Sequence, residues 1–220
     1  MDTLLRRRSM MVGGGSPLPY TPVEYIQTDG TAYIDTGIVG ADPRSAEIKC
    51  VIKANSTLLL ASSAGNENAS NYMLLGSSSG GLAMIAHYYF YSGSMPSLQD
   101  SITNGTPFTA RIAMAKGSQS VSVKFDGESS YTTVTKADKQ TIRSTRTMYL
   151  FGSNTGATPN VSASGARVYY CKIYSDNTYG NLVFDGVPCY YNGVYGMWDN
   201  VSDTFFGNAA ASGAFSGPQI

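Results

Sequence analysis

The feature that most constrains this chain is the recurrence of apolar residues at every second position. In residues 47–53 every second side chain, from Ile48 to Ile52, is apolar, and the charged side chains all lie at the positions in between or beside them. A similar alternation appears in residues 108–114 and 120–125. A period of two is that of a half-buried β-strand, whereas an amphipathic helix has a period of 3.6. The pattern predicts that the following alternate side chains face a core: Ile48, Cys50, Ile52, Ile112, Met114, Val121, Val123 and Phe125.

Further short β-rich runs, broken by Gly, Asn or Ser, extend this pattern along the chain. They predict strands at residues 32–38, 57–62, 72–76, 82–91, 147–151, 167–174 and 182–184. Asp126-Gly127 predicts a type I′ hairpin that pairs residues 120–125 with 129–135. With 24 Gly and 16 Tyr in 220 residues, the chain favours one large all-β sandwich or barrel and disfavours helices.

The first 22 residues differ from the rest by being basic and rich in Gly and Pro. They contain too few apolar groups for a core of their own, so we expect residues 1–22 to be an extended docking arm and residues 23–220 the folded domain. Arginines can form charge-assisted hydrogen bonds with a partner while leucines and methionines bury apolar surface against it. The expected docking residues are Leu4, Leu5, Arg6, Arg7, Arg8, Met10 and Met11.

Charge, hydropathy and cysteine content limit which partners the chain can bind and in which compartment it can function. The formal net charge is zero and the basic residues are dispersed outside Arg6–Arg8, so no nucleic-acid partner is expected. No stretch approaches the ~20 apolar residues of a membrane-spanning helix, and no apolar segment of a secretory signal follows the arginines. Cys50, Cys171 and Cys189 are odd in number and far apart, which predicts buried free thiols rather than a disulfide framework.

Two segments carry a resemblance to a known family. Residues 23–38 (VEYIQTDGTAYIDTGI) resemble the opening strands of laminin-G-like, concanavalin A-type jelly rolls of gut bacterial and phage proteins. Residues 168–174 (VYYCKIY), 180–189 (GNLVFDGVPC), 196–199 (GMWD) and 205–208 (FFGN) are similar to the closing strands of the same proteins. The resemblance implies an antiparallel two-sheet jelly-roll sandwich with function on its loops or its concave face. Residues 54–147 match by strand pattern alone.

This family includes glycosidases, but the sequence disfavours an enzyme. His87 is the only histidine, so no two-histidine metal site exists in the chain. The paired carboxylates of such glycosidases lie in a Glu-x-Asp-x-(x)-Glu run, which is absent. Asp126 and Glu128 are two residues apart but flank Gly127 in a predicted turn. Glycoside hydrolysis is therefore the least favoured of the candidate functions.

Aromatic and acidic residues supply the candidate binding sites of this chain. Tyrosine suits carbohydrate because it has an apolar ring and a polar tip, although the same residues also build cores and interfaces. The candidate glycan-binding residues are His87, Tyr89, Tyr91, Tyr190, Tyr191 and Tyr195. No cofactor is expected. Calcium binding stays possible because carboxylates lie in predicted loops, although they form no EF-hand pattern. The candidate calcium ligands are Asp29, Asp35, Asp199 and Asp203.

A Tyr-, Ser- and Gly-rich body without an export signal fits a virion protein, which is assembled in the host cytoplasm and released by lysis. Our first hypothesis is a phage structural protein: a capsid decoration, head-fibre or tail-appendage subunit. It would be homo-oligomeric, dock to other virion subunits through its arm, and display a jelly roll toward host-surface glycans. The alternative is a bacterial carbohydrate-binding or adhesion module. The arm separates the two, since a virion anchor needs partner subunits.

Overall fold

The computed structural model describes residues 18–41, 43–52, 58–63, 72–78, 81–86, 97–98, 105–115, 117–136, 143–156, 158–161 and 163–220. All seven expected docking residues of the arm lie outside these ranges, as do the glycan candidates His87, Tyr89 and Tyr91. In the part of the chain that the structure describes, no helix is long and apolar enough to cross a membrane.

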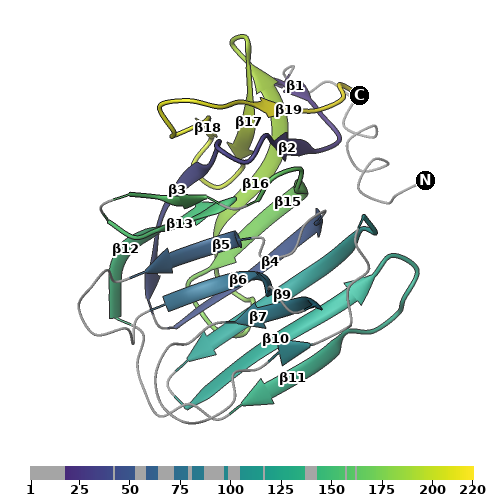
Figure 1. Ribbon diagram of the computed structural model, residues 1–220, viewed down its shortest axis with the longest axis vertical. Helices are drawn as coiled ribbons and strands as arrows, with labels where there is room; N and C mark the ends of the chain where they lie inside the picture. The colour runs from purple at the N-terminus through teal and green to yellow at the C-terminus, as the bar shows by residue number, and fades with distance from the viewer. Residues whose placement is uncertain are drawn as a thin grey trace.

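The chain folds into two stacked β-sheets, and the described residues contain no helix (Figure 1). The larger sheet has the order β11-β10-β9-β4-β15-β16-β17-β18; in addition, β1 pairs with β16, β2 with β15, and β19 with β2. Its strands are β1 (Thr21–Pro22), β2 (Ile26–Thr28), β4 (Arg44–Val51), β9 (Phe108–Ala115), β10 (Ser118–Phe125), β11 (Thr132–Lys136), β15 (Arg167–Tyr174), β16 (Leu182–Tyr191), β17 (Val194–Asp199), β18 (Thr204–Phe206) and β19 (Phe215–Ser216).

The smaller sheet has the order β14-β13-β5-β6-β7-β8, and β12 pairs with both β3 and β5. Its strands are β3 (Ile34–Ala41), β5 (Leu58–Ser63), β6 (Tyr72–Ser78), β7 (Gly81–Ala86), β8 (Ser97–Leu98), β12 (Arg143–Leu150), β13 (Gly152–Asn154) and β14 (Asn160–Val161). The predicted two-sheet antiparallel sandwich is thus confirmed. One short pair differs, because β13 runs parallel to β5.

The exception arises at Phe151, the last residue of the strand predicted at residues 147–151, which separates β12 from β13. Leu150 is paired antiparallel with Leu60, whereas Ser153 is paired parallel with Ala61. Phe151 has a φ of 68°, a left-handed conformation that reverses the chain between them. Its backbone N–H donates to the carbonyl of Leu59 at 2.8 Å. Strand propensity alone does not reveal such a reversal.

The main core lies between the sheets and follows the predicted alternation. Seven of the eight residues expected to face inward are at most 2% exposed, and Phe125 is half-buried against the same core. Cys50, Cys171 and Cys189 are free and buried, as expected. A one-residue shift of register would have turned these side chains to the opposite face.

A second, smaller cluster lies on the outer face of the larger sheet. It contains Tyr20, Val187, Cys189 and Trp198. Tyr20 comes from the described end of the expected arm, because Thr21 and Pro22 form β1 and pair with Tyr190 and Cys189 of β16. Residues 20–22 therefore pack on the sandwich, whereas Leu18 and Pro19 are exposed.

The predicted hairpin after β10 exists, but its turn is of another type. Val123 pairs with Thr132, so β11 begins three residues later than expected. Gly127 has a φ of 95°, whereas Asp126 is not among the described residues with positive φ, and Glu128 N–H donates to the Phe125 carbonyl at 3.1 Å. A type I′ turn needs positive φ at both central residues, so this is a type II-like turn. The loop that follows it brings Tyr131 over the outer face.

Candidate functional site

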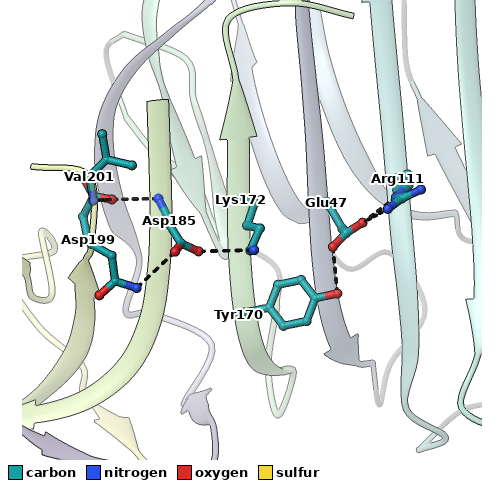
Figure 2. A network of polar contacts seen from close by, with 8 residues as sticks. Glu47, Arg111, Tyr170, Lys172, Asp185, Asp199 and Val201 are labelled. Atoms are coloured by element: carbon teal, nitrogen blue, oxygen red, sulfur yellow. Dashed lines mark hydrogen bonds and ion pairs between the residues drawn. The ribbon is translucent and has the colours of Figure 1, made fainter. Parts of the chain in front are cut away.

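A row of polar side chains crosses the outer face of the larger sheet from strand to strand (Figure 2). Each member is paired in register with the next, and the sequence neighbours of each are buried, so the row points away from the main core. From β10 to β16 the row consists of Ser122, Arg111, Glu47, Lys172 and Asp185.

Glu47 and Arg111 form the centre of this row. The Nε and Nη2 of Arg111 both contact Oε2 of Glu47. The hydroxyl of Tyr170 donates to Oε1 of Glu47 at 2.9 Å, and that of Tyr131 donates to Oε2 at 3.3 Å. Burial disfavours the charge of Arg111, but the hydrogen bond and the charge of Glu47 outweigh it, and the pKa of Arg111 is raised. The guanidinium of Arg111 therefore stays charged and is held against Glu47 by charge-assisted hydrogen bonds.

Tyrosine rings surround this ion pair. The Arg111 guanidinium carbon lies 4.2 Å from the ring centre of Tyr131 and 5.0 Å from that of Tyr179. Tyr179 in turn meets the ring of Tyr174 edge-on, with 5.6 Å between ring centres. These contacts define the tyrosine face, which comprises Tyr131, Tyr170, Tyr174 and Tyr179 around Arg111 and Glu47.

The hydroxyls of this face remain protonated over the physiological range. Burial, reinforced by the charge of Glu47, raises the pKa of Tyr131 to about 12. Burial also raises the pKa of Tyr170, Tyr174 and Tyr179. All four hydroxyls can therefore donate hydrogen bonds, and Tyr131 and Tyr170 already donate to Glu47.

The aromatic surface continues along β15 through a β-bulge. Val168 pairs with Cys50 and Tyr170 with Lys49, so the extra residue Tyr169 shares the outer face with Tyr170. The ring of Tyr169 lies 5.5 Å from that of Tyr25 and 5.8 Å from Nζ of Lys49. Cations and tyrosines thus alternate along this strand.

At the other end of the row, Asp185 is held between two donors. Nζ of Lys172 lies 3.8 Å from Oδ1 of Asp185, and Nδ2 of Asn200 donates to Oδ2 at 3.1 Å. The buried Asp199 accepts a hydrogen bond from the backbone N–H of Asp185 at 2.7 Å and another from Val201 at 3.1 Å. Asp199 thereby fixes the loop after β17 beside the row.

The four candidate calcium ligands all accept hydrogen bonds from other groups of the protein. Asp29 accepts four hydrogen bonds, from the backbone of residues 31, 32 and 214 and the hydroxyl of residue 31. Asp35 accepts one from the backbone of residue 37, and Asp203 accepts one from the indole of residue 198 at 3.2 Å. Within the described ranges, no group of three or more His, Cys, Asp or Glu side chains could hold a metal ion. Calcium binding by Asp29, Asp35, Asp199 and Asp203 stays a prediction.

The described glycan candidates are divided between the two sides of the larger sheet. The ring centres of Tyr190 and Tyr195 lie 4.9 Å apart, and both residues pack against the main core. Tyr191 lies with the smaller cluster, 5.5 Å from Trp198 and 5.2 Å from Phe205. The structure therefore does not bring Tyr190, Tyr191 and Tyr195 into one surface.

The tyrosine face itself was not anticipated from sequence. One signal was available for part of it, because Tyr170, Lys172 and Tyr174 alternate with the buried Cys171 and Ile173. Period-two alternation alone would have placed them on the outer side. No comparable signal marks Tyr131 and Tyr179, which reach the face from loops.

Together with the neighbouring Lys172, the tyrosine face combines aromatic rings with phenol, guanidinium, ammonium and carboxylate groups on the outer face of the larger sheet. Aromatic rings pack on the apolar faces of sugars, while such polar groups exchange hydrogen bonds with sugar hydroxyls. The arrangement is therefore chemically suited to binding carbohydrate.

Comparison with known proteins gives structural similarities but no family. No family model matches the chain, and no curated protein matches it in sequence. Among solved structures, the chain is similar to the enzymatically active domain of bacteriophage CBA120 tailspike protein 2, with 11% identity and a TM-score of 0.47, covering 75% of this chain and 30% of that one. It is also similar to domains LG4-5 of the mouse laminin alpha1 chain (16% identity, TM-score 0.48, covering 77% and 45%).

A third similarity is to the heptameric SAP-like pentraxin of Limulus polyphemus, with 13% identity and a TM-score of 0.44, covering 74% of each chain. The chain thus spans less than half the length of the tailspike and laminin chains. Likenesses of this size carry no conclusion about activity or partners.

Proposed function

We propose that this chain is a carbohydrate-binding β-sandwich module that holds a glycan on the tyrosine face of its larger sheet. The observation that carries the proposal is the Glu47–Arg111 ion pair with the rings of Tyr131 and Tyr179 on its guanidinium. Ordered aromatic rings and fixed polar groups lower the entropy lost on binding, as a carbohydrate site requires.

We propose a bacteriophage particle as the setting, with the module acting as a structural subunit that displays this face toward host-surface glycans. The support comes from the sequence: the resemblance of residues 23–38 and 168–174 to phage jelly rolls, and the basic first 22 residues. An antibody against the protein should label particles made from the genome that encodes it. Unlabelled particles would favour the bacterial adhesion module instead.

The proposed activity is binding without hydrolysis. The two carboxylates of the row are both engaged, Glu47 by Arg111 and tyrosine hydroxyls, and Asp185 by Lys172 and Asn200. We expect no release of reducing sugar from any polysaccharide that the protein binds. Turnover that disappears in Glu47→Gln or Asp185→Asn would contradict this expectation.

The experiment that tests the proposal is a binding screen on an array of bacterial capsular and O-antigen polysaccharides together with plant and animal glycans. Tyr174→Ala should lower the affinity at least tenfold, because loss of ~1.4 kcal/mol of aromatic contact is a factor of ten. Tyr149→Ala is the matched control, since it removes a half-buried tyrosine from β12 of the smaller sheet. No binding by the unaltered protein, or equal loss in both variants, would overturn the proposal.

A further inference from the structure

The loop 175–181, between β15 and β16, is tied together by one carboxylate. Oδ1 of Asp176 accepts hydrogen bonds from the backbone N–H of Thr178 at 2.7 Å, from its hydroxyl at 2.9 Å, and from the backbone N–H of Gly180 at 3.1 Å. Oδ2 accepts the N–H of Asn181. These backbone and side-chain bonds, led by that of Gly180, lower the pKa of Asp176 to about 2. The loop therefore keeps this organisation at every pH at which Asp176 is charged.

The same loop is closed at its base and is attached to the sheet near its start. The backbone N–H of Ser175 donates to the carbonyl of Asn181 at 2.9 Å, which closes the loop at its base. The hydroxyl of Ser45, on β4, donates to the carbonyl of Asp176 at 2.7 Å. A loop of Ser, Asn, Thr and Gly is thus fixed over the outer face.

This loop holds Tyr179 in a conformation that tyrosine disfavours. Its φ is 62°, in the left-handed region where the Cβ of an L-residue crowds the backbone. Asn192 also has a positive φ, 48°, but asparagine adopts that region readily. Asparagine or glycine at position 179 would adopt this positive φ at a lower cost in conformational energy.

The strained backbone conformation places the Tyr179 ring against two members of the tyrosine face. The ring lies 5.0 Å from the Arg111 guanidinium and meets Tyr174 edge-on. Tyr131 contacts the same guanidinium from the loop after β10 without a positive φ. Strained non-glycine residues concentrate at functional sites, where the surrounding structure holds them.

We infer that Tyr179 is the specificity-determining residue of the tyrosine face and that Asp176 is the positioning residue that presents it. The inference rests on the proposed carbohydrate-binding function. The ring is fixed before binding, so it selects sugars by the shape of the face that packs on it. Asp176 contributes through Tyr179 alone.

The test pairs Tyr179→Asn with Tyr131→Asn. Each removes one ring from Arg111; the second also removes the hydrogen bond from Tyr131 to Glu47, and only the first relieves strain. We expect Tyr179→Asn to lower the Tm by less than Tyr131→Asn. On the glycan array, Tyr179→Asn should lose at least tenfold in affinity and change the rank order of the glycans bound. A larger fall in Tm for Tyr179→Asn, or an unchanged rank order and affinity, would overturn the inference.

Asp176 is tested by its dependence on Tyr179. Asp176→Ala should reduce binding as much as Tyr179→Asn, and the double variant should lose no more than either alone. Asp176→Asn, which keeps an Oδ1 acceptor, should retain most of the affinity. Additive losses would contradict a positioning role.

If the unaltered protein binds no arrayed glycan, the proposed function fails, and this assignment of Tyr179 and Asp176 fails with it. If it binds but Tyr179→Asn binds equally well, the function stands and this inference is wrong.

Discussion

At Glu47, four donor groups from three other elements converge on one carboxylate in the middle of the sheet. Its side chain is 11% exposed and that of Arg111 is 34% exposed. An uncompensated buried charge costs roughly 3–5 kcal/mol, and the partial exposure of Arg111 reduces this to about 2 kcal/mol.

We therefore expect Glu47→Ala to lower the free energy of unfolding by about 2 kcal/mol, as measured by urea denaturation, because Arg111 is left without its counter-charge. Asp126→Ala is the control: Asp126 pairs with Lys49 at 3.0 Å, but its side chain is 55% exposed. An exposed pair contributes about 0–1 kcal/mol. Equal effects of the two substitutions would show that the Glu47 centre adds nothing to stability.

The three thiols give a second prediction at the scale of residues. Burial raises the pKa of Cys50, and the nearby Cys171 adds to the effect; burial likewise raises the pKa of Cys171. The thiolate is the reactive form, so native protein at pH 8 should react slowly with a thiol reagent. In denaturant all three cysteines should react at once. Rapid labelling of all three in the native protein would contradict the buried placement.

Individual strands show which parts of the fold were accessible from sequence. β15 has the predicted bounds, 167–174, because its apolar and polar residues alternate on either side of one bulge. β16 was predicted to end at 184 but continues to Tyr191. Gly186 and Pro188 lie in this extension, and both are disfavoured in strands by local propensity. Pairing of β16 with β15, β17 and β1 overrides that preference.

The hairpin between β16 and β17 has a clear sequence signal, Asn192-Gly193. Asn192 and Gly193 both have positive φ, 48° and 87°, between the paired residues Tyr191 and Val194. This is the type I′ geometry that Asn-Gly favours, and that was predicted at Asp126-Gly127 instead. Asn-Gly between two β-rich runs is as strong a hairpin signal as Asp-Gly, so the position of this turn follows from the sequence.

The turn also gives a prediction at the scale of elements. A Cβ at Gly193 would meet no atom within 4 Å, so Gly193→Ala is disfavoured by its backbone conformation alone. We expect a loss of about 1–2 kcal/mol in the free energy of unfolding. Asn192→Gly is the control, since glycine accepts the same conformation, and its effect should be a few tenths of a kcal/mol. A larger effect of Asn192→Gly would show that the asparagine side chain stabilises the turn.

The tyrosine face is a property of the whole molecule. Arg111 lies 64 residues from Glu47, and Tyr170 lies 123 residues from it. Only the strand order β9-β4-β15 brings them side by side, and alternation within a strand does not reveal the strand order. The outward position of Tyr170 could thus be predicted, whereas its contact with Glu47 could not. Tyr131 and Tyr179 depend further on loops that cross the sheet.

The point at which the chain enters the sandwich is a second property of the whole molecule. The ring of Tyr20 lies 5.2 Å from that of Trp198, the single tryptophan of the chain. Beside it, the backbone N–H of Ile220 donates to the carbonyl of Pro22 at 3.4 Å, so both ends of the domain meet near β1 (Figure 1). Tryptophan emission therefore reports on whether residues 20–22 are in place.

Two deletions separate docking from folding. Removing residues 1–17 should leave the Tm and the tryptophan emission unchanged, because Tyr20 and β1 are retained, while incorporation into phage particles is lost. Removing residues 1–22 should also lower the free energy of unfolding by about 2 kcal/mol, the contribution of one large buried side chain, and shift the emission to longer wavelength as Trp198 meets water. Tyr20→Ala in the full chain is the matched control, since it should reproduce the emission shift without loss of incorporation. Normal incorporation of the shorter deletion, or its failure to fold, would show that residues 1–17 are not the docking arm.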